Sequence, residues 1–164
     1  MPWNKPYTPI YNQRLDPELY QSTGYITFIT ICAYTNLRPF TNPKLNQIII
    51  DILQSEQARY PCAIYTYCLM PDHLHYLISP SRDGNSVIDF TNQFKGKSTN
   101  LSWKFGWHGK LWQPRFYDHI VRAEEDLRAI AEYILANPVR KGLVPSVDEW
   151  PWSGCFTPLP LGPT

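Results

Sequence analysis

The sequence predicts an α+β fold in which an antiparallel β-sheet is covered by helices. Three observations carry this prediction. Segments rich in β-prone residues recur along the chain, and segments with helical spacing of apolar residues separate them. The turn Met70-Pro71-Asp72 joins two of the β-prone segments directly, as in a hairpin. No repeat or low-complexity segment interrupts this order, so we expect one principal domain.

The first half of the chain predicts a strand followed by a helix. Residues 25–32 are apolar or threonine on both faces, so we expect a central strand. Asn42 and Pro43 mark a helix start, because Asn accepts hydrogen bonds from the free amides of a first turn and proline fits there. Apolar residues at helical spacing then continue to about Tyr60.

The second half predicts the hairpin, another helix and a last strand. The hairpin strands lie on either side of the turn, at 65–69 and 73–78. Asn85 or Ser86 caps the second helix, and residues 115–121 form the fourth strand. The resulting order, β-α-β-β-α-β, is the ferredoxin-like pattern of four antiparallel strands with the helices on one side.

An additional C-terminal helix is expected from near Ala123, with Pro138 ending or kinking it after Asn137. Gly142 indicates a C-terminal stop. Acidic residues suit the first turn of this helix because they complement its dipole: Glu124, Glu125 and Asp126.

We divide the chain into an extended N-terminal arm at 1–23, the main domain at 24–152 and a proline-rich tail at 153–164.

Size and composition exclude several classes of protein. With 164 residues, 43% hydrophobic and 15% aromatic residues, the chain can bury a core and is globular. No apolar run is long enough to cross a bilayer and no signal peptide is visible, so we expect a cytoplasmic protein without membrane contact. The cysteines form no C-x-x-C pair and are expected to be mostly buried thiols: Cys32, Cys62, Cys68 and Cys155.

A net charge of only +1 is weak support for a nucleic-acid partner, but the basic residues are unevenly spread. Between 91 and 122 they are interleaved with aromatic rings, and Asp118 is the only acid. Cations can meet phosphates and rings can stack on bases in a single-strand groove. The alternative is a solvated helix face and a core strand. The candidate DNA-binding residues are Lys95, Lys97, Lys104, Arg115 and Arg122.

His73 and His75 point to the same face of their strand, because side chains alternate along a strand. Two imidazoles side by side can form half of a metal site. The alternative is a half-exposed strand face without chemistry, since an H-x-H pair also arises by chance.

Tyr133 does not lie on the apolar stripe of its helix. At roughly 100° per residue it lies about 130° from the stripe's centre, and Asn137 shares its flank one turn later. The simplest alternative is a half-exposed surface tyrosine. Together with the histidine pair, a tyrosine nucleophile and a partly open site of His73, His75 and Asn137 suit Mg²⁺ or Mn²⁺ and a phosphate substrate.

The run Met-Pro-Asp-His-Leu-His at 70–75 resembles the His-hydrophobic-His motif of the HUH endonucleases. The segments 112–122 and 132–142 resemble those of REP-associated tyrosine transposases, which belong to the single-tyrosine transposases of that superfamily. The resemblance spans about 25–152. It implies a ferredoxin-like single-tyrosine transposase domain, a divalent metal on His73 and His75, and Tyr133 as nucleophile. The wider family has a glutamine where this chain has Asn137.

The resemblance also implies the reaction and its substrate. The tyrosine would attack single-stranded DNA at hairpin repeats, giving a 5′-phosphotyrosine intermediate and a free 3′-OH that allows rejoining. The alternatives are a domesticated hairpin-DNA-binding protein without transposition activity and a different metalloenzyme built on the histidine pair. Tyr117 is a competing nucleophile. Homodimer and monomer are equally compatible with the sequence.

Overall fold

The computed structural model describes residues 14–122 and 125–160, without the side chain of Asn36. Within that part, five antiparallel strands form one sheet in the order β4-β1-β3-β2-β5. The strands are β1 (Thr27–Cys32), β2 (Cys62–Met70), β3 (His73–Pro80), β4 (Tyr117–Ile120) and β5 (Ser153–Cys155). The helices are α1 (Pro43–Arg59), α2 (Val87–Ser102), α3 (Leu127–Leu135) and α4 (Asn137–Arg140), with short 3-10 helices at Pro17–Gln21, Tyr34–Asn36, Trp103–Phe105 and Val147–Glu149.

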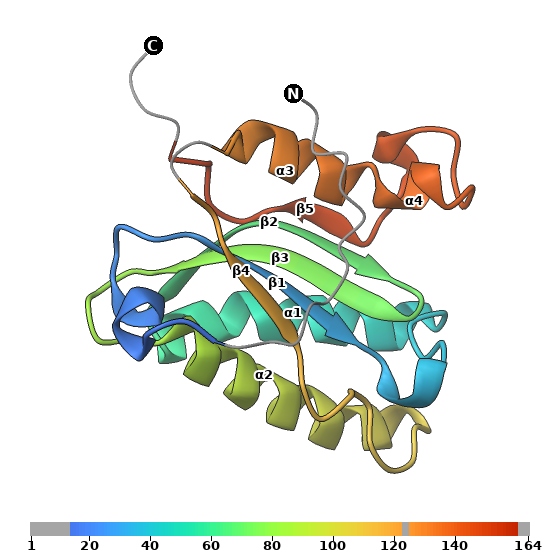
Figure 1. Ribbon diagram of the computed structural model, residues 1–164. Coiled ribbons are helices and arrows are strands. Elements are labelled where there is room, and N and C mark those ends of the chain that lie inside the picture. Colours follow the sequence, from blue (N-terminus) through green and yellow to red (C-terminus); the bar gives the residue numbers. More distant parts are fainter. Residues whose placement is uncertain (1–13, 123–124, 161–164) are drawn as a thin grey trace.

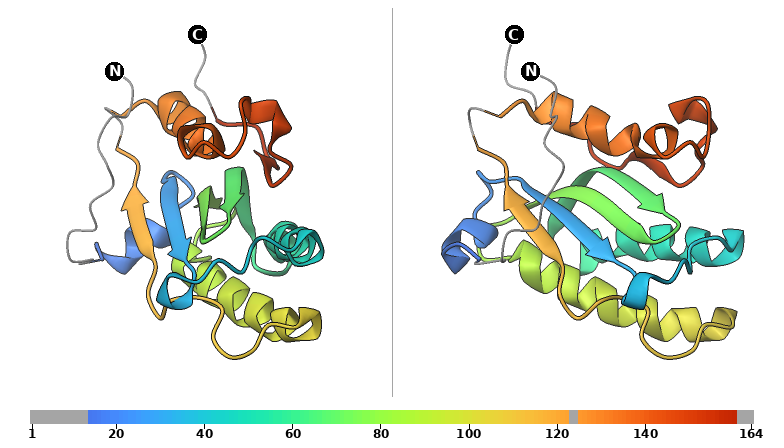
Figure 2. Two further views of the ribbon diagram at one scale, coloured as in Figure 1. Left: turned by 90° about the vertical axis from the view of Figure 1, so that its right-hand side faces the viewer. Right: turned by 45° about the vertical axis from the view of Figure 1, so that its right-hand side comes forward.

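The sheet lies between two helical layers. Helices α1 and α2 cover one face, and α3 and α4 lie over the other (Figures 1 and 2). The larger core fills the first layer, where Tyr76, Phe90 and Phe94 are fully buried. A smaller core on the second face packs Ile130 and Ile134 of α3 on the strands. The α+β class and the β-α-β-β-α-β order of the first four strands are confirmed.

The local signals for α1 and α2 are confirmed. The Asn42 side chain accepts hydrogen bonds from the first turn of α1, and Ser86 caps α2 in the same way. The Pro71-Asp72 turn is held by backbone hydrogen bonds from the segment after β1: Ala33 donates to the Asp72 carbonyl at 2.8 Å and Phe40 to the Pro71 carbonyl at 3.1 Å. The start of β3 is therefore fixed to the end of β1.

The last helix begins later than predicted. Asp126 is the N-cap of α3 and accepts a hydrogen bond from the Ala129 amide, so the helix does not start near Ala123. Glu125 lies before the helix. Its carboxylate accepts hydrogen bonds there from the His119 ring at 2.9 Å and from the Arg122 amide at 2.9 Å. Ala123 and Glu124 lie outside the described residues.

The two ends of the domain also differ from the prediction. The sheet has a fifth strand, because Ser153–Cys155 from the expected tail pairs with the free edge of β2. Residues 1–13 of the expected arm lie outside the described part, and Pro17–Gln21 forms a 3-10 helix rather than an extended segment. Cys155 is exposed rather than buried. In the described part of the chain no helix has the length and apolarity to span a membrane.

Candidate active site

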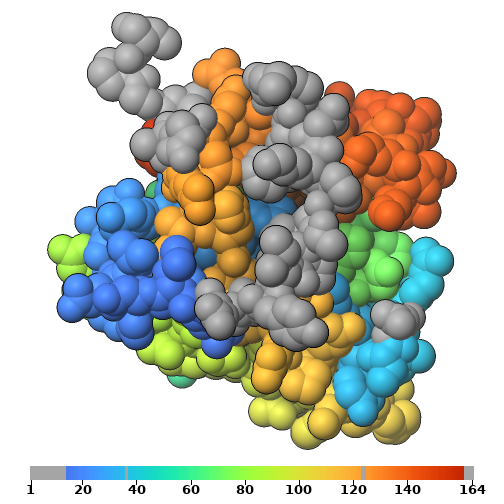
Figure 3. All heavy atoms as spheres, in the orientation of Figure 1, coloured from blue at the N-terminus to red at the C-terminus, as the bar shows by residue number. Residues whose placement is uncertain are grey.

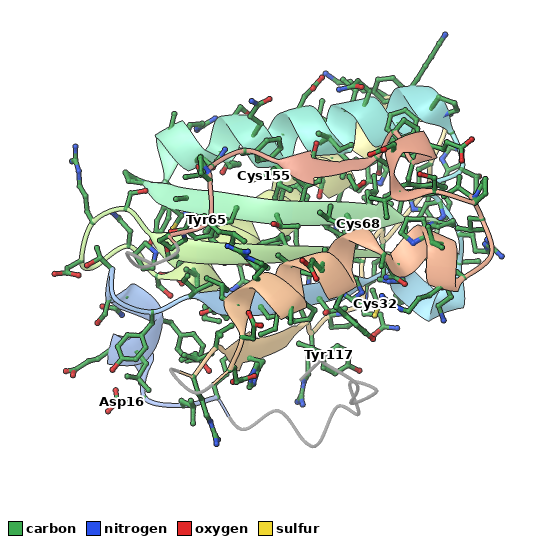
Figure 4. The ribbon with its side chains drawn as sticks, turned by 90° about the horizontal axis from the view of Figure 1, so that it is seen from above. Asp16, Cys32, Tyr65, Cys68, Tyr117 and Cys155 are labelled. Carbon is green, nitrogen blue, oxygen red and sulfur yellow. The ribbon has the colours of Figure 1, made fainter. Side chains whose placement is uncertain are left out.

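The two histidines lie side by side on the face of the sheet that α3 covers. Their ring centroids are 4.5 Å apart and the ring planes meet at 72°. The register places His75 between Thr30 of β1 and Cys68 of β2, and places His73 beside Cys32. Figure 4 looks down on this face. The labelled Cys32 marks the position opposite His73, and the labelled Cys68 marks the position opposite His75.

Each imidazole is oriented by a hydrogen bond at Nδ1. The His73 Nδ1–H donates to Asp72 Oδ1 at 2.6 Å, and the His75 Nδ1 lies 2.8 Å from Thr30 Oγ1. With Nδ1 protonated, each ring keeps its Nε2 lone pair for another partner. This is the arrangement in which second-shell groups orient metal-binding histidines.

The electrostatics keep His75 neutral. Burial lowers the pKa of His75 well below its usual value, and the neighbouring His73 and Arg140 side chains act in the same direction. The hydrogen bond from His73 lowers the pKa of Asp72, so that carboxylate stays ionised and continues to accept. A neutral imidazole is the form that binds a metal.

Asn137 completes the group from α4. Its side chain is buried, at 3% exposure, and its Nδ2 lies 3.1 Å from His73 Nε2. The chain reaches this position because α3 ends at Leu135 and a new short helix begins at Asn137, so the break lies two residues earlier than predicted, with Pro138 in the first turn of α4. Turning the amide over would present its oxygen to the same point, so the group fits a divalent cation with two nitrogen ligands and one oxygen ligand.

Other clusters of metal-binding residues do not compete with this one. The described residues contain no group of three or more His, Cys, Asp or Glu side chains able to hold a metal ion. A cation at His73 and His75 would therefore depend on Asn137, with the remaining positions left to water or phosphate oxygens.

Tyr133 lies on α3, whose apolar side faces the sheet. Ile130, Ala131 and Ile134 are buried there, whereas Tyr133 is half-buried, off the stripe as predicted. The guanidinium carbon of Arg140 lies 3.7 Å from the centre of the Tyr133 ring. The helix that carries the tyrosine thus lies over the face of the sheet to which the two histidines of β3 point (Figure 1).

Tyr117, the competing nucleophile, faces the same side of the sheet. It pairs with Thr30, which in turn pairs with His75, so these three side chains share one row across the strands. Figure 4 shows Tyr117 and Cys68 on opposite sides of α3. Tyr117 is half-buried on β4.

The predicted DNA-binding lysines of α2 have intramolecular partners. Lys95 donates to the backbone carbonyls of Gln113 at 2.7 Å and Pro114 at 3.1 Å, and burial lowers its pKa to about 8. Lys97 forms an ion pair with the buried carboxylate of Glu56 on α1. Because α2 lies on the other face of the sheet, neither lysine joins the histidines. Lys104, Arg115 and Arg122 are exposed.

Three residues at this site were missed by sequence reasoning. Thr30 is brought to His75 only by strand register, so no local signal marks it. Asp72 could have been found, because an acidic residue directly before a histidine can reach its ring. Arg140 lies in the segment 132–142 but was given no role of its own, whereas its side chain contacts Tyr133.

Comparisons with known proteins show which family the chain resembles. A sequence profile of the family described as "Transposase IS200 like" matches residues 21–137. A protein of Haemophilus influenzae designated a candidate REP-associated tyrosine transposase is 30% identical over 141 residues, which is 79% of each chain. The REP-associated tyrosine transposase of Escherichia coli is 32% identical over 94 residues, covering 57% of this chain and 54% of that relative.

Solved structures show the same fold. A REP-associated tyrosine transposase bound to a REP hairpin superposes with a TM-score of 0.72 at 23% identity, covering 88% of this chain and 82% of that one. A crystal structure described as a transposase from Deinococcus radiodurans gives a TM-score of 0.50 at 18% identity, covering 68% and 88%.

Proposed function

The chain belongs to the family of IS200-like transposases, and from that premise we propose that it cleaves and rejoins single-stranded DNA at hairpin repeats in a metal-dependent reaction. The observation that carries the proposal is the 3.1 Å contact between Asn137 and His73. It brings a third polar ligand to the histidine pair from a segment that directly follows the helix bearing Tyr133.

His73, His75 and Asn137 would hold Mg²⁺ or Mn²⁺. When bound, such a cation withdraws charge from the phosphate and orients it for in-line attack. Asp72 and Thr30 keep the two imidazoles facing the site, so little reorganisation is needed when the ligand set forms.

Tyr133 supplies the nucleophile. Its phenolic oxygen forms a bond to phosphorus while the bond between phosphorus and the 3′-oxygen breaks. The proton lost by the phenol ends on that 3′-oxygen. The products are a 5′-phosphotyrosine link and a free 3′-OH, and attack by the 3′-OH of another strand reverses the chemistry and rejoins DNA. No external energy source is consumed, because the number of phosphoester bonds is unchanged.

A shallow groove at the end of β1, with Lys95 and Lys110 in its lining, supports a path for the DNA strand. It has a volume of about 310 Å³ and lies between α2 and the segment 110–114. The groove lies close to the histidines along the backbone, because the Gln113 amide donates to the Cys32 carbonyl at 2.9 Å and Cys32 pairs with His73. A strand leaving the histidines could therefore pass around this edge.

Exposed cations and rings continue this surface. Lys110 lies 5.3 Å from the centre of the Tyr34 ring, and Trp103 is 51% exposed near Lys104. Figure 3 shows the segment after α2, in yellow, beside the light-blue segment that follows β1. We propose phosphate contacts for Lys104, Arg115 and Arg122, and assign Lys95 and Lys97 to holding the loop and the helices in place.

A covalent-trapping gel tests the proposal. End-labelled single-stranded hairpin DNA and Mn²⁺ are mixed with wild-type protein, Tyr133→Phe or Tyr117→Phe. We expect a denaturation-resistant protein–DNA band with the wild type and with Tyr117→Phe, and none with Tyr133→Phe. A band that persists in Tyr133→Phe would assign the nucleophile to Tyr117. Hairpin binding without a band, over a panel of hairpins, would identify a domesticated DNA-binding protein.

A further inference from the structure

Arg140 is the last residue of α4, and its side chain folds back over Tyr133. The guanidinium carbon lies 3.7 Å from the centre of the phenol ring, which is the stacked geometry of a cation–π contact. In addition, Nη1 donates to the Tyr133 carbonyl oxygen at 2.6 Å. Ring and backbone of the same residue are thus held by one side chain.

The break between α3 and α4 explains why this contact forms. Tyr133 lies in the last turn of α3, where carbonyl groups lose their helical donors. A new short helix starts at Asn137, with Pro138 in its first turn, and it turns the chain so that Arg140 can donate to the Tyr133 carbonyl. The same four-residue helix carries Asn137, so one element delivers both side chains.

Arg140 also belongs to the short helix that reaches the histidines. That helix carries Asn137, whose Nδ2 lies 3.1 Å from His73 Nε2. Within the described part of the chain, its other N–H groups have no hydrogen-bond partner, and the residue is exposed. A permanent positive charge with free, planar donors therefore lies against the tyrosine, on the same short helix as Asn137.

We propose that Arg140 is a positioning residue for Tyr133 and that its free N–H groups bind the non-bridging oxygens of the phosphate that Tyr133 attacks. The proposal rests on the function proposed above. A guanidinium offers two parallel donors that match two phosphate oxygens, whereas an ammonium acts as a point charge. The stacked contact would hold the ring while the same group holds the phosphate next to it.

Single-turnover cleavage measures this role with Arg140→Lys, Arg140→Ala and the control Lys141→Ala. Lys141 is an exposed cation one residue further on, so its removal costs the same charge without touching Tyr133. We expect the rate of adduct formation to fall about 100-fold in both Arg140 variants, the scale for loss of one preorganised donor, with hairpin affinity within about threefold. The control should match the wild type.

Chemical rescue separates this role from a structural one. Millimolar methylguanidinium should restore part of the adduct rate of Arg140→Ala and leave Arg140→Lys unchanged. Wild-type rates in Arg140→Lys, or equal losses in Lys141→Ala, would overturn the proposal. Absence of rescue in a folded Arg140→Ala variant would overturn the phosphate contact.

A spectroscopic measurement tests the contact between Arg140 and Tyr133 even when the protein cleaves no DNA. If the wild type forms no adduct, the transposase chemistry fails by itself. The stacking is then read from the fluorine resonance of 3-fluorotyrosine placed at Tyr133, which should shift in Arg140→Gln and not in Lys141→Gln. An unchanged resonance in Arg140→Gln would refute the positioning role.

Discussion

Replacing Thr30 with valine removes one hydrogen bond from His75 and keeps the shape of the side chain. Thr30 is only 5% exposed and its Oγ1 lies 2.8 Å from His75 Nδ1, so water cannot easily replace the lost partner. A buried donor left unpaired costs about 1–3 kcal/mol of unfolding free energy. The ring also loses the group that orients it, which typically weakens metal binding about 10- to 100-fold.

Thr27→Val is the matched control. Thr27 lies on the same strand and is 1% exposed, but strand alternation turns it to the opposite face, toward α1 and α2. Mn²⁺ affinity is measured by calorimetric titration of the wild type and both variants, and stability by urea unfolding without metal. We expect weaker Mn²⁺ binding in Thr30→Val alone.

Two outcomes would refute parts of this reasoning. Equal Mn²⁺ affinity in Thr30→Val and Thr27→Val would show that the hydrogen bond does not orient His75 as a ligand. If His73→Ala also bound Mn²⁺ like the wild type, the metal site itself would be wrongly assigned. Loss of binding in both threonine variants would point to a general effect on the sheet.

Three further predictions follow from the same structure. A mixture of His73→Ala and Tyr133→Phe proteins should form no DNA adduct, because Asn137 contacts His73 of its own chain and directly follows the helix that bears Tyr133. Lys97→Met should lower the unfolding free energy by about 2 kcal/mol, because it leaves the buried carboxylate of Glu56 with only the longer contact to Arg59 at 3.9 Å, and a second change, Glu56→Leu, should recover most of that loss. Burial and a hydrogen bond to a β4 carboxylate raise the pKa of Tyr20 from 10.0 to about 12, so the stability that this residue contributes is present below pH 10 and is lost as the pH rises toward 12.

Each of these three predictions has a direct measurement and an outcome that would contradict it. Adduct formation in the mixture, read on the covalent-trapping gel, would show a tyrosine supplied by a second chain. For Lys97→Met, urea unfolding gives the free energies of unfolding. If the double variant with Glu56→Leu is no more stable than Lys97→Met alone, the buried carboxylate of Glu56 is not the cause of the loss. For Tyr20, the difference in urea midpoint between wild type and Tyr20→Phe should shrink from pH 9 to pH 11, and a constant difference would contradict the coupling to Asp118.

Local geometry explains the predictions that the sequence supported by itself. Asn42 and Ser86 cap the helices as predicted, because a cap involves only the next two or three residues. The shared face of His73 and His75 follows from the two-residue period of a strand, and the placement of Tyr133 off the buried stripe follows from the helical period. The break before Pro138 follows from its missing amide hydrogen.

Contacts between distant segments could not be read from such periods. The Thr30–His75 pair depends on the register of β1 against β3, and the Lys97–Glu56 pair depends on how α2 packs on α1. Residues 153–155 form a strand only because β2 offers a free edge, although their sequence looks like a proline-rich tail.

The sequence by itself therefore determined the order of elements, the histidine pair and the tyrosine, since each is encoded within a few neighbouring residues. Only the tertiary structure decided how other side chains meet them. Thr30 orients one histidine, the predicted Asn137 is brought against the other, and Arg140 stacks on Tyr133. The physical reason is that these three contacts form only when separate elements fold onto one another, through strand register, a helix break and packing on one face of the sheet.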